Sequence, residues 1–415
     1  MIERSEWMVI YPIAVMKAGG AYMPLDYTFP SERLKFMCED AGVNLILSEG
    51  TKVSDALPDF TGYVLTTEEA INLRPTSYTL DITRRASAGN AMVVLYTSGT
   101  TGMPKGVILE YGGIVNFCYW YTDEFDVTEQ DRSLAYANFG FDAHMMDIYP
   151  ALSKGASVYI ISDKMRMDLD AMNTYMNEQG INLAFMTTQV GCIFASGQIE
   201  NQSLRLLSVS GEKLPSVKKP PYRFYNACGH TECSIYTTYY PIEQDYTGNV
   251  IGRPLANYIL YILDKNLKAV PQGIAGELVI GGAGVGRCYI NRPELTEEKF
   301  ITINGERAYR TGDLVLWNEE GQMEYLGRID KQVKLRGLRI ELGEIESKAT
   351  AIEGINQAAA EVKKVGDTDR LVLYYTLKED AQVLTEETIR DSLESSSLAA
   401  YMIPDDYVKL DAMPL

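Results

Sequence analysis

The chain lacks the features of a secreted, membrane-spanning or disulfide-stabilised protein. Its six cysteines include no CxxC pair, and its 415 residues contain only two histidines, His144 and His230. No run of about 18 apolar residues occurs, and the N-terminus has no charged-then-apolar signal pattern. Cysteines without paired spacing in a chain of this length favour reduced thiols. We therefore expect a cytoplasmic protein with no membrane partner.

Positive charge is also scarce. The chain has 38 lysines and arginines against 56 acidic residues, a formal net charge of −18. This excess repels nucleic acid and anionic lipid, so neither is an expected partner. Any anionic ligand must be held by local groups, because the overall field opposes it. Hydrophobic residues make up 46% of the chain, enough for large cores in about two or three units.

The order of the apolar segments predicts an α/β protein. In the first part of the chain, strands such as 44–48 and 91–98 alternate with helical patterns such as 31–42, which favours crossover units and a mostly parallel sheet. Later, short alternating segments broken by glycine favour antiparallel β structure. We expect a large N-terminal domain (1–330) of layered α/β subdomains with a β-rich subdomain, and a small C-terminal α+β domain (331–415).

One loop suggests the chemistry. Residues 95–106 read LYTSGTTGMPKG, an apolar strand end, then glycines and hydroxyls, then a lysine. A strand that runs into a glycine loop exposes backbone N–H groups to an anion, and the hydroxyls and Lys105 add donors. Pro104 precedes the lysine, so this is not the GxxxxGK[ST] of a Walker A loop. A shorter stretch would indicate only a tight turn, but this one points to phosphate binding.

The loop resembles the phosphate-binding loop of the adenylate-forming superfamily: adenylation domains of nonribosomal peptide synthetases, acyl-CoA synthetases and luciferases. Six further segments resemble the peptide-synthetase branch in the same order: KAGGAYMPLD (17–26), FDAHMMDIYPAL (141–152), NACGHTE (226–232), YRTGDLV (309–315), GRIDKQVKLRGLRIELGEIES (327–347) and YMIPDDYVKLDAMPL (401–415). By this resemblance the chain is identified as an adenylation domain, apparently cut at both ends and lacking the family's C-terminal lysine segment.

The resemblance implies an AMP-forming ligase. In the family, a substrate carboxylate attacks the α-phosphorus of ATP with Mg²⁺ present, giving an acyl-adenylate and pyrophosphate. A carboxylate is already a nucleophile at neutral pH, so catalysis reduces to positioning and charge neutralisation, which agrees with the scarcity of histidine. A second step passes the acyl group to the phosphopantetheine thiol of a peptidyl carrier protein domain.

The matched motifs also imply roles for individual residues. The catalytic residues are expected to be Lys105, Thr231 at the α-phosphate, Glu232 as the Mg²⁺ ligand, and Arg328 at the ribose or phosphate. Asp313 is assigned to the ribose hydroxyls. The other nucleotide contacts are assigned to Thr97, Ser98, Gly99, Thr100, Thr101, Gly102, Asn226, Ala227, Cys228 and Gly229. Asp330 matches the family's hinge, about which the small domain turns so that KLRGLRIE (334–341) faces the site and admits phosphopantetheine.

Asp142 indicates the substrate class. An aspartate in this apolar stretch should be buried and needs a partner, although a helix N-cap would give the same local pattern. The matching family aspartate pairs with a substrate α-ammonium, which implies an α-amino acid. An apolar side chain is favoured, and the hydroxyls leave a smaller polar one open. The side-chain pocket maps onto Ala143, Met146, Phe185, Ser208, Ser210, Ala227, Ile235 and Tyr236.

Two positions depart from the family, and two alternatives stay open. Cys228 replaces an aromatic residue that stacks on adenine, which could cost about 1 kcal/mol, and His230 replaces a proline. With Cys233, these residues lack the paired spacing of a zinc site. A ligase for acyl-CoA or aryl acids is disfavoured by Asp142, because such acids have no ammonium. A catalytically impaired binding module is supported by the missing lysine segment and by NACGHTE.

Overall fold

The computed structural model describes residues 1–73, 86–99, 103–330, 332–366, 368–378 and 384–413. Three predicted site residues, Thr100, Thr101 and Gly102, lie outside this part of the chain. Among the described residues, no helix has the length and apolar character needed to cross a membrane.

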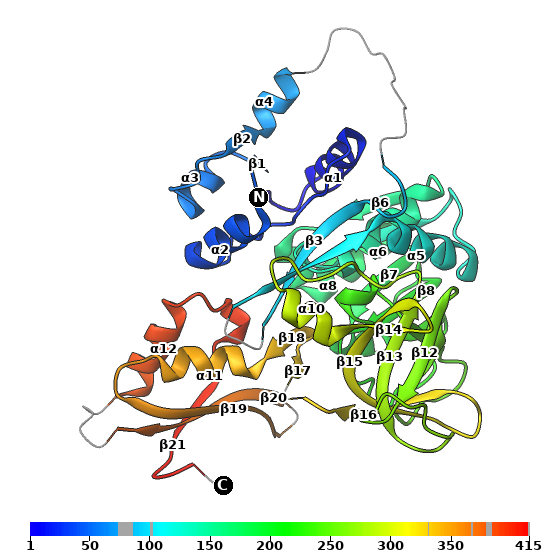
Figure 1. Ribbon diagram of the computed structural model, residues 1–415. Helices are drawn as coiled ribbons and strands as arrows, with labels where there is room; N and C mark the ends of the chain where they lie inside the picture. Colours follow the sequence, from blue (N-terminus) through cyan, green and yellow to red (C-terminus); the bar gives the residue numbers. More distant parts are fainter. Residues whose placement is uncertain (74–85, 100–102, 331, 367, 379–383, 414–415) are drawn as a thin grey trace.

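The N-terminal region is a layer of short helices over a two-stranded parallel pair (Figure 1). Two of its helices end at glycines in a left-handed backbone conformation, Gly19 (φ +86°) and Gly42 (φ +65°). The elements are α1 (Trp7–Ala18), α2 (Ser31–Ala41), α3 (Lys52–Ala56), α4 (Thr67–Asn72), β1 (Leu45–Ser48) and β2 (Tyr63–Thr66).

The predicted parallel sheet is confirmed in the middle of the chain. Its strands are short apolar runs that pair in the parallel sense, and helices supply the crossovers. The strands are β5 (Arg132–Ala135), β6 (Ser157–Ile160), β7 (Leu183–Thr187), β8 (Leu206–Ser210) and β9 (Arg223–Cys228). The helices are α5 (Tyr111–Glu124), α6 (Ala143–Ser153), α7 (Asp163–Arg166), α8 (Leu169–Gln179) and α9 (Thr188–Ala195).

The β-rich part continues the same sheet with antiparallel pairs, starting where β10 pairs with β9. This agrees with the glycine-broken alternating pattern of the sequence. The junction holds the 3-10 turn η1 (Thr231–Cys233), which places NACGHTE where the sheet changes sense. The strands are β10 (Thr238–Pro241), β11 (Val250–Pro254), β12 (Tyr258–Leu263), β13 (Gly276–Gly282), β14 (Phe300–Ile303), β15 (Glu306–Trp317) and β16 (Met323–Arg328), with α10 (Pro293–Lys299).

The phosphate-loop strand differs from the prediction. The sequence predicted that 91–98 belongs to a mostly parallel sheet, but β3 (Ala91–Thr97) pairs antiparallel with β4 (Lys105–Glu110). The reason is the short connection, which returns the chain directly so that Thr97 lies opposite Lys105. The loop is therefore the tip of a hairpin rather than the entry to a helix.

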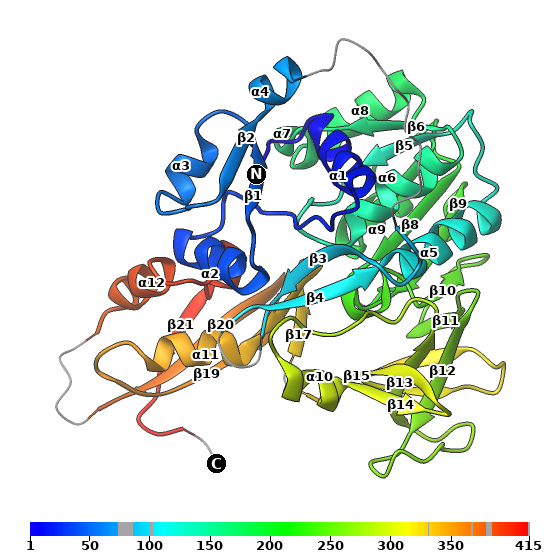
Figure 2. The same ribbon diagram turned by 45° about the horizontal axis from the view of Figure 1, so that its top comes forward.

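The C-terminal part has a hydrophobic core of its own, separate from the main cluster. Leu335, Ile345, Leu373, Ile389 and Met402 are among its buried members. Both views show its helices and strands grouped together beside α2 (Figures 1 and 2). The elements are β17 (Gln332–Leu335), β18 (Leu338–Glu341), α11 (Leu342–Thr350), β19 (Ile355–Val365), β20 (Thr368–Leu377), α12 (Glu386–Glu394), η2 (Ala400–Met402) and β21 (Asp406–Lys409).

Candidate active site at the junction of two cores

The described residues at the end of the β3–β4 hairpin include groups that could bind an anion. Ser98 is buried, and the buried hydroxyl oxygen of Thr97 has no hydrogen-bond partner among the described residues. Gly99 is required sterically, because a Cβ there would lie 1.9 Å from the carbonyl oxygen of Met103. An unpaired buried hydroxyl is costly unless a ligand completes it. The loop thus contains donors available to a ligand.

Lys105 closes the base of this loop. Its side chain is only 5% exposed, and its Nζ lies 5.2 Å from the ring centroid of Tyr289 and 3.5 Å from Oε1 of Glu341. Burial and the charge of Arg339 lower the pKa of Lys105, while Glu232 and Glu341 oppose that shift. A buried ammonium of this kind interacts strongly with any anion that reaches it.

Glu232, on η1, is fully buried and ionised. The Tyr289 hydroxyl donates to its Oε1 at 2.6 Å, and Nη1 of Arg339 lies 2.8 Å from its Oε2. Burial alone would raise the pKa of Glu232, but Arg339, Lys105 and the Tyr289 hydroxyl outweigh it and hold the pKa below the usual range. The carboxylate can therefore bind a hard cation at neutral pH.

The backbone around NACGHTE has an unusual conformation. Ser234 and Ile235 both have positive φ angles, +59° and +82°, which costs on the order of 1–3 kcal/mol per non-glycine residue. Gly229 accommodates this turn, because a Cβ there would lie 1.7 Å from the carbonyl oxygen of Ile235. The turn brings Ile235 into the main core while Glu232 remains beside Lys105.

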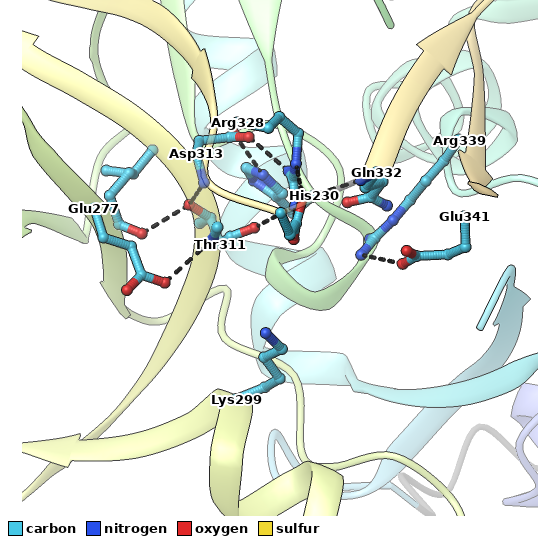
Figure 3. Close-up of polar contacts among 12 residues, drawn as sticks. His230, Glu277, Lys299, Thr311, Asp313, Arg328, Gln332, Arg339 and Glu341 are labelled. Carbon is cyan, nitrogen blue, oxygen red and sulfur yellow. Dashed lines mark hydrogen bonds and ion pairs between the residues drawn. The ribbon is translucent and has the colours of Figure 1, made fainter. Parts of the chain in front are cut away.

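Asp313 and Arg328 are brought together by the register of β15 and β16, in which they are direct partners. Nη1 of Arg328 donates to Oδ1 of Asp313 at 2.6 Å, and His230 Nε2 lies 2.9 Å from Oδ2 (Figure 3). Burial would raise the pKa of Asp313, but His230 and Arg328 keep it below its usual range. Arg328 also donates to Asp330, the predicted hinge residue, at 2.7 and 2.6 Å.

A cavity of about 380 Å³ is lined by Arg328, the partner of this carboxylate. Cys228, Ala227 and Arg328 line it as predicted, and Tyr325 and Lys334 line it although sequence reasoning missed them. Asn226 also lines the cavity, but its side-chain amide donates to the carbonyl of Val250 at 3.1 Å. Tyr325, on a different strand from Cys228, and Tyr246 are aromatic residues that line this cavity.

Asp142 lies at the N-terminus of α6 but makes no capping hydrogen bond there. The residue is half-buried and its carboxyl group is enclosed, so the expected burial holds for the carboxyl group. Burial raises the pKa of Asp142 to about 6, the nearby Thr231 hydroxyl opposes the rise, and the charge of Glu232 adds to it. The carboxyl thus lies directly beside NACGHTE.

The predicted side-chain pocket is largely brought together. Phe185 and Tyr236 pack edge to face with ring centroids 6.4 Å apart, and the Tyr236 hydroxyl donates to Ser208 Oγ at 3.4 Å. Ser208 and Phe185 are register partners on β8 and β7. Met146, Ala227 and Ile235 are buried in the same core, while Ala143 and Ser210 are half-buried.

Three side chains of the C-terminal part enter the site, and sequence reasoning did not assign them. Besides Arg339 on Glu232 and Glu341 on Lys105, Glu344 Oε2 accepts from the Gly99 N–H at 3.2 Å. Arg339 and Glu341 are two residues apart on β18 and so share a face. The charged residues at alternate positions of this short strand are the sequence signal that could have indicated their place in the site.

The residues present fit a polyphosphate with a divalent cation. The Gly99 N–H in the loop already donates to an anionic group, the carboxylate of Glu344. Glu232 is already paired with a cation, the guanidinium of Arg339. Fold and site together define a class of protein that binds a charged phosphate ligand between a large α/β unit and a smaller one.

The family follows from comparison with known proteins. A family model described as AMP-binding enzyme matches residues 1–290, and the chain belongs to this family. It is 39% identical over its whole length to part of bacitracin synthase 1 of Bacillus licheniformis, and 39% identical to part of tyrocidine synthase 1 of Brevibacillus parabrevis. The chain spans only 8% and 38% of these two relatives.

Solved structures of nonribosomal peptide synthetases are also similar to this chain. An artificially fused adenylation–PCP di-domain of a nonribosomal peptide synthetase from Klebsiella oxytoca superposes with a TM-score of 0.85 at 25% identity, covering 98% of this chain and 82% of that one. A four-domain nonribosomal peptide synthetase bound to AMP and glycine gives 0.71 at 32% identity, covering 100% of this chain and 31% of that one.

Proposed function

We propose that this chain activates an α-amino acid with ATP, forming an aminoacyl-adenylate and pyrophosphate, and then loads the phosphopantetheine thiol of a peptidyl carrier domain. One observation carries the proposal: Asp142, at the start of α6, lies so near the η1 turn that Thr231 and Glu232 both shift the pKa of its carboxyl group. An acid suited to an ammonium therefore lies beside the phosphate-side motif.

The chemistry needs no general base. Asp142 pairs with the substrate ammonium, and the α-carboxylate, only one carbon away, is thereby confined close to Thr231. Lys105 and the loop N–H groups neutralise the phosphates, and Asp313 and Arg328 hold the ribose. Glu232 is the residue that would hold Mg²⁺, which when bound supplies charge neutralisation on phosphate oxygens.

An apolar amino acid fits the pocket best. Met146, Phe185 and Ile235 are buried apolar side chains of one core. The hydroxyls of Tyr236 and Ser208 are paired with each other, so a polar substrate side chain would have to compete with an existing hydrogen bond. A leucine- or phenylalanine-like side chain is the proposed substrate class.

The small C-terminal unit, 331–415, is proposed to move about Asp330. Its carboxylates lie on Lys105 and on the Gly99 N–H, and its Arg339 lies on Glu232. These are the positions proposed for the phosphates and Mg²⁺, so the nucleotide and the small unit exclude each other. The turn at Gly337 contacts Thr187, and its N–H donates to Glu212 at 2.7 Å, which is the proposed entry point for the phosphopantetheine arm.

ATP–pyrophosphate exchange by the natural polypeptide, tested over the proteinogenic amino acids, decides the function. We expect exchange with one amino acid or a few apolar ones. Exchange only with fatty or aryl acids would indicate an acyl or aryl ligase, and no exchange with any acid would indicate a binding module.

Arg339→Ala tests whether the small unit competes with the nucleotide for the site. The change frees Glu232 and removes one ion pair that competes with Mg·ATP, so we expect the KM for ATP to fall by roughly threefold to tenfold. Carrier loading should slow, since the contact that holds the small unit in place is weakened. The matched control is Arg336→Ala on the same hairpin, where the arginine pairs with Asp405 and is half exposed. Equal ATP KM values for the two variants would contradict the proposed competition.

Amino-acid affinity should depend on pH through Asp142. Its pKa is raised to about 6, so the carboxyl is ionised above that pH and protonated below it. Because only the ionised form pairs with an ammonium, affinity should be constant above about pH 7 and fall about tenfold per unit below pH 6. Calorimetric titration with the activated amino acid, without nucleotide or Mg²⁺, measures this. A profile that is flat from pH 7.5 to pH 5 would contradict the role of Asp142.

A further inference from the structure

The hydrogen bond between His230 and Asp313 has no role in the scheme above. His230 is 4% exposed and Asp313 is 1% exposed, and the bond joins residues 83 positions apart in the sequence. The other ring nitrogen of His230, Nδ1, is buried and has no hydrogen-bond partner in the part of the chain that the structure describes. A buried imidazole in this state is costly, and its one polar contact is with a carboxylate proposed to bind the nucleotide.

The direction of the bond follows from the chemistry of the two groups. Asp313 is ionised, since two donors face it, and an ionised carboxylate can only accept. Nε2 of His230 therefore carries the hydrogen and donates it to Oδ2. This fixes the tautomer and the ring orientation, because the Nδ1 lone pair has no competing donor among the described residues.

The bond also fixes the carboxylate plane. Arg328 Nη1 donates to Oδ1 at 2.6 Å while His230 donates to Oδ2 at 2.9 Å, so each oxygen is held by one donor. Each carboxylate oxygen has two lone-pair positions. One position per oxygen stays free, and a vicinal diol supplies two donors to match.

Arg328 alone cannot fix the plane of the Asp313 carboxylate, because its guanidinium group also donates to other acceptors. The same guanidinium donates to both oxygens of Asp330 and to the carbonyl of Thr311 at 2.9 Å. If Asp330 is a hinge, these contacts change as the small unit turns. His230 lies on the loop between β9 and η1 in the large unit, so its contact with Asp313 does not depend on that motion.

We propose that His230 is a positioning residue for nucleotide binding, which locks the Asp313 carboxylate in the orientation that accepts both ribose hydroxyls. This inference rests on the proposed function, because it takes Asp313 as the ribose site. It also gives a role to the departure from the family's proline, at a site where Cys228 offers the base no ring.

Binding of AMP, measured by calorimetry, tests the inference without turnover. We expect His230→Leu to weaken AMP binding about tenfold, the usual effect of losing a hydrogen bond to a charged group. His230→Gln should stay within about threefold of the natural chain, since its amide nitrogen can occupy the place of Nε2 and donate. If the leucine variant does not fold, His230→Asn replaces it, because its shorter amide does not reach Asp313.

The decisive comparison uses 2′-deoxy-AMP and 3′-deoxy-AMP. Each lacks one ribose hydroxyl, so the loss caused by His230→Leu should shrink to less than about threefold with at least one of them. His144→Leu is the matched control: His144 is also buried, and its Nε2 lies 2.8 Å from the Tyr22 hydroxyl instead. This variant should bind AMP as the natural chain does.

Three results would overturn the inference. They are equal AMP affinity in the natural chain and the leucine variant, the same loss for AMP and both deoxy analogues, and no AMP binding at all. Failure of the proposed function is a separate result. If pyrophosphate exchange is absent but AMP binds and depends on His230, the function is wrong while His230 keeps its role.

Discussion

Replacement of Lys105 by alanine is expected to lower ATP–pyrophosphate exchange by about 10²- to 10³-fold, the usual effect of removing one preorganised donor from a developing phosphate charge. Lys105 is a buried cation at the base of the glycine loop that resembles a phosphate-binding loop, and its Nζ lies 3.5 Å from a carboxylate oxygen of Glu341. In a protein of net charge −18, no long-range field can replace that local charge.

The loss from Lys105→Ala should include weaker ATP binding as well as slower exchange, with amino-acid affinity unchanged. The fold should remain intact, because the aliphatic stem packs at the end of a hairpin whose backbone pairing does not involve the ammonium. Lys154→Ala, at an exposed position after α6, is the control. Nucleotide affinity equal to that of the natural chain in Lys105→Ala would remove the phosphate role of the loop.

Asp142→Ala is expected to abolish amino-acid-dependent exchange. Removing one partner from an enclosed ion pair typically costs about 3–5 kcal/mol, which corresponds to about 10²- to 10⁴-fold in amino-acid affinity. ATP binding should change little, because the Thr231 hydroxyl near Asp142 remains in place.

The same variant can be tested with a substrate lacking the ammonium. The deaminated analogue of the activated amino acid has nothing to pair with Asp142, so its weak binding should be the same in the natural chain and in Asp142→Ala. If Asp142→Ala exchanges as fast as the natural chain, the ammonium pairing is wrong, and the amino-acid substrate class loses its main support.

Much of the candidate site could be predicted from the sequence because it consists of local backbone features. The glycine loop ends β3 and returns through Lys105, and the NACGHTE turn needs Gly229 to pass the Ile235 carbonyl. Such turns leave a dense signature of glycine, proline and hydroxyl residues. The resemblance then added roles, as for Asp142, whose capping alternative the structure does not support.

The antiparallel pairing of the β3–β4 hairpin and the residues that contact the site residues could not be predicted from the sequence. Strand 91–97 has the same apolar composition as a parallel strand, and only the short return decides its antiparallel sense. The Tyr289 hydroxyl donates to Glu232, and Tyr325 lines the cavity together with Cys228. Both tyrosines are far in sequence from these two residues. A tyrosine in a β-rich region gives no sign of which carboxylate or cavity it will reach.

The sequence by itself determined the loop, the acid and the family, because each depends on residue types at fixed short spacing. Only the tertiary structure decided that His230 binds Asp313 and that Arg339, Glu341 and Glu344 lie at the positions proposed for the phosphates and Mg²⁺. Those contacts join segments between 83 and 245 residues apart. The first depends on how distant strands of the large unit pack together, and the other three depend on how the two cores pack against each other. Packing between whole surfaces is not recorded in any local sequence pattern.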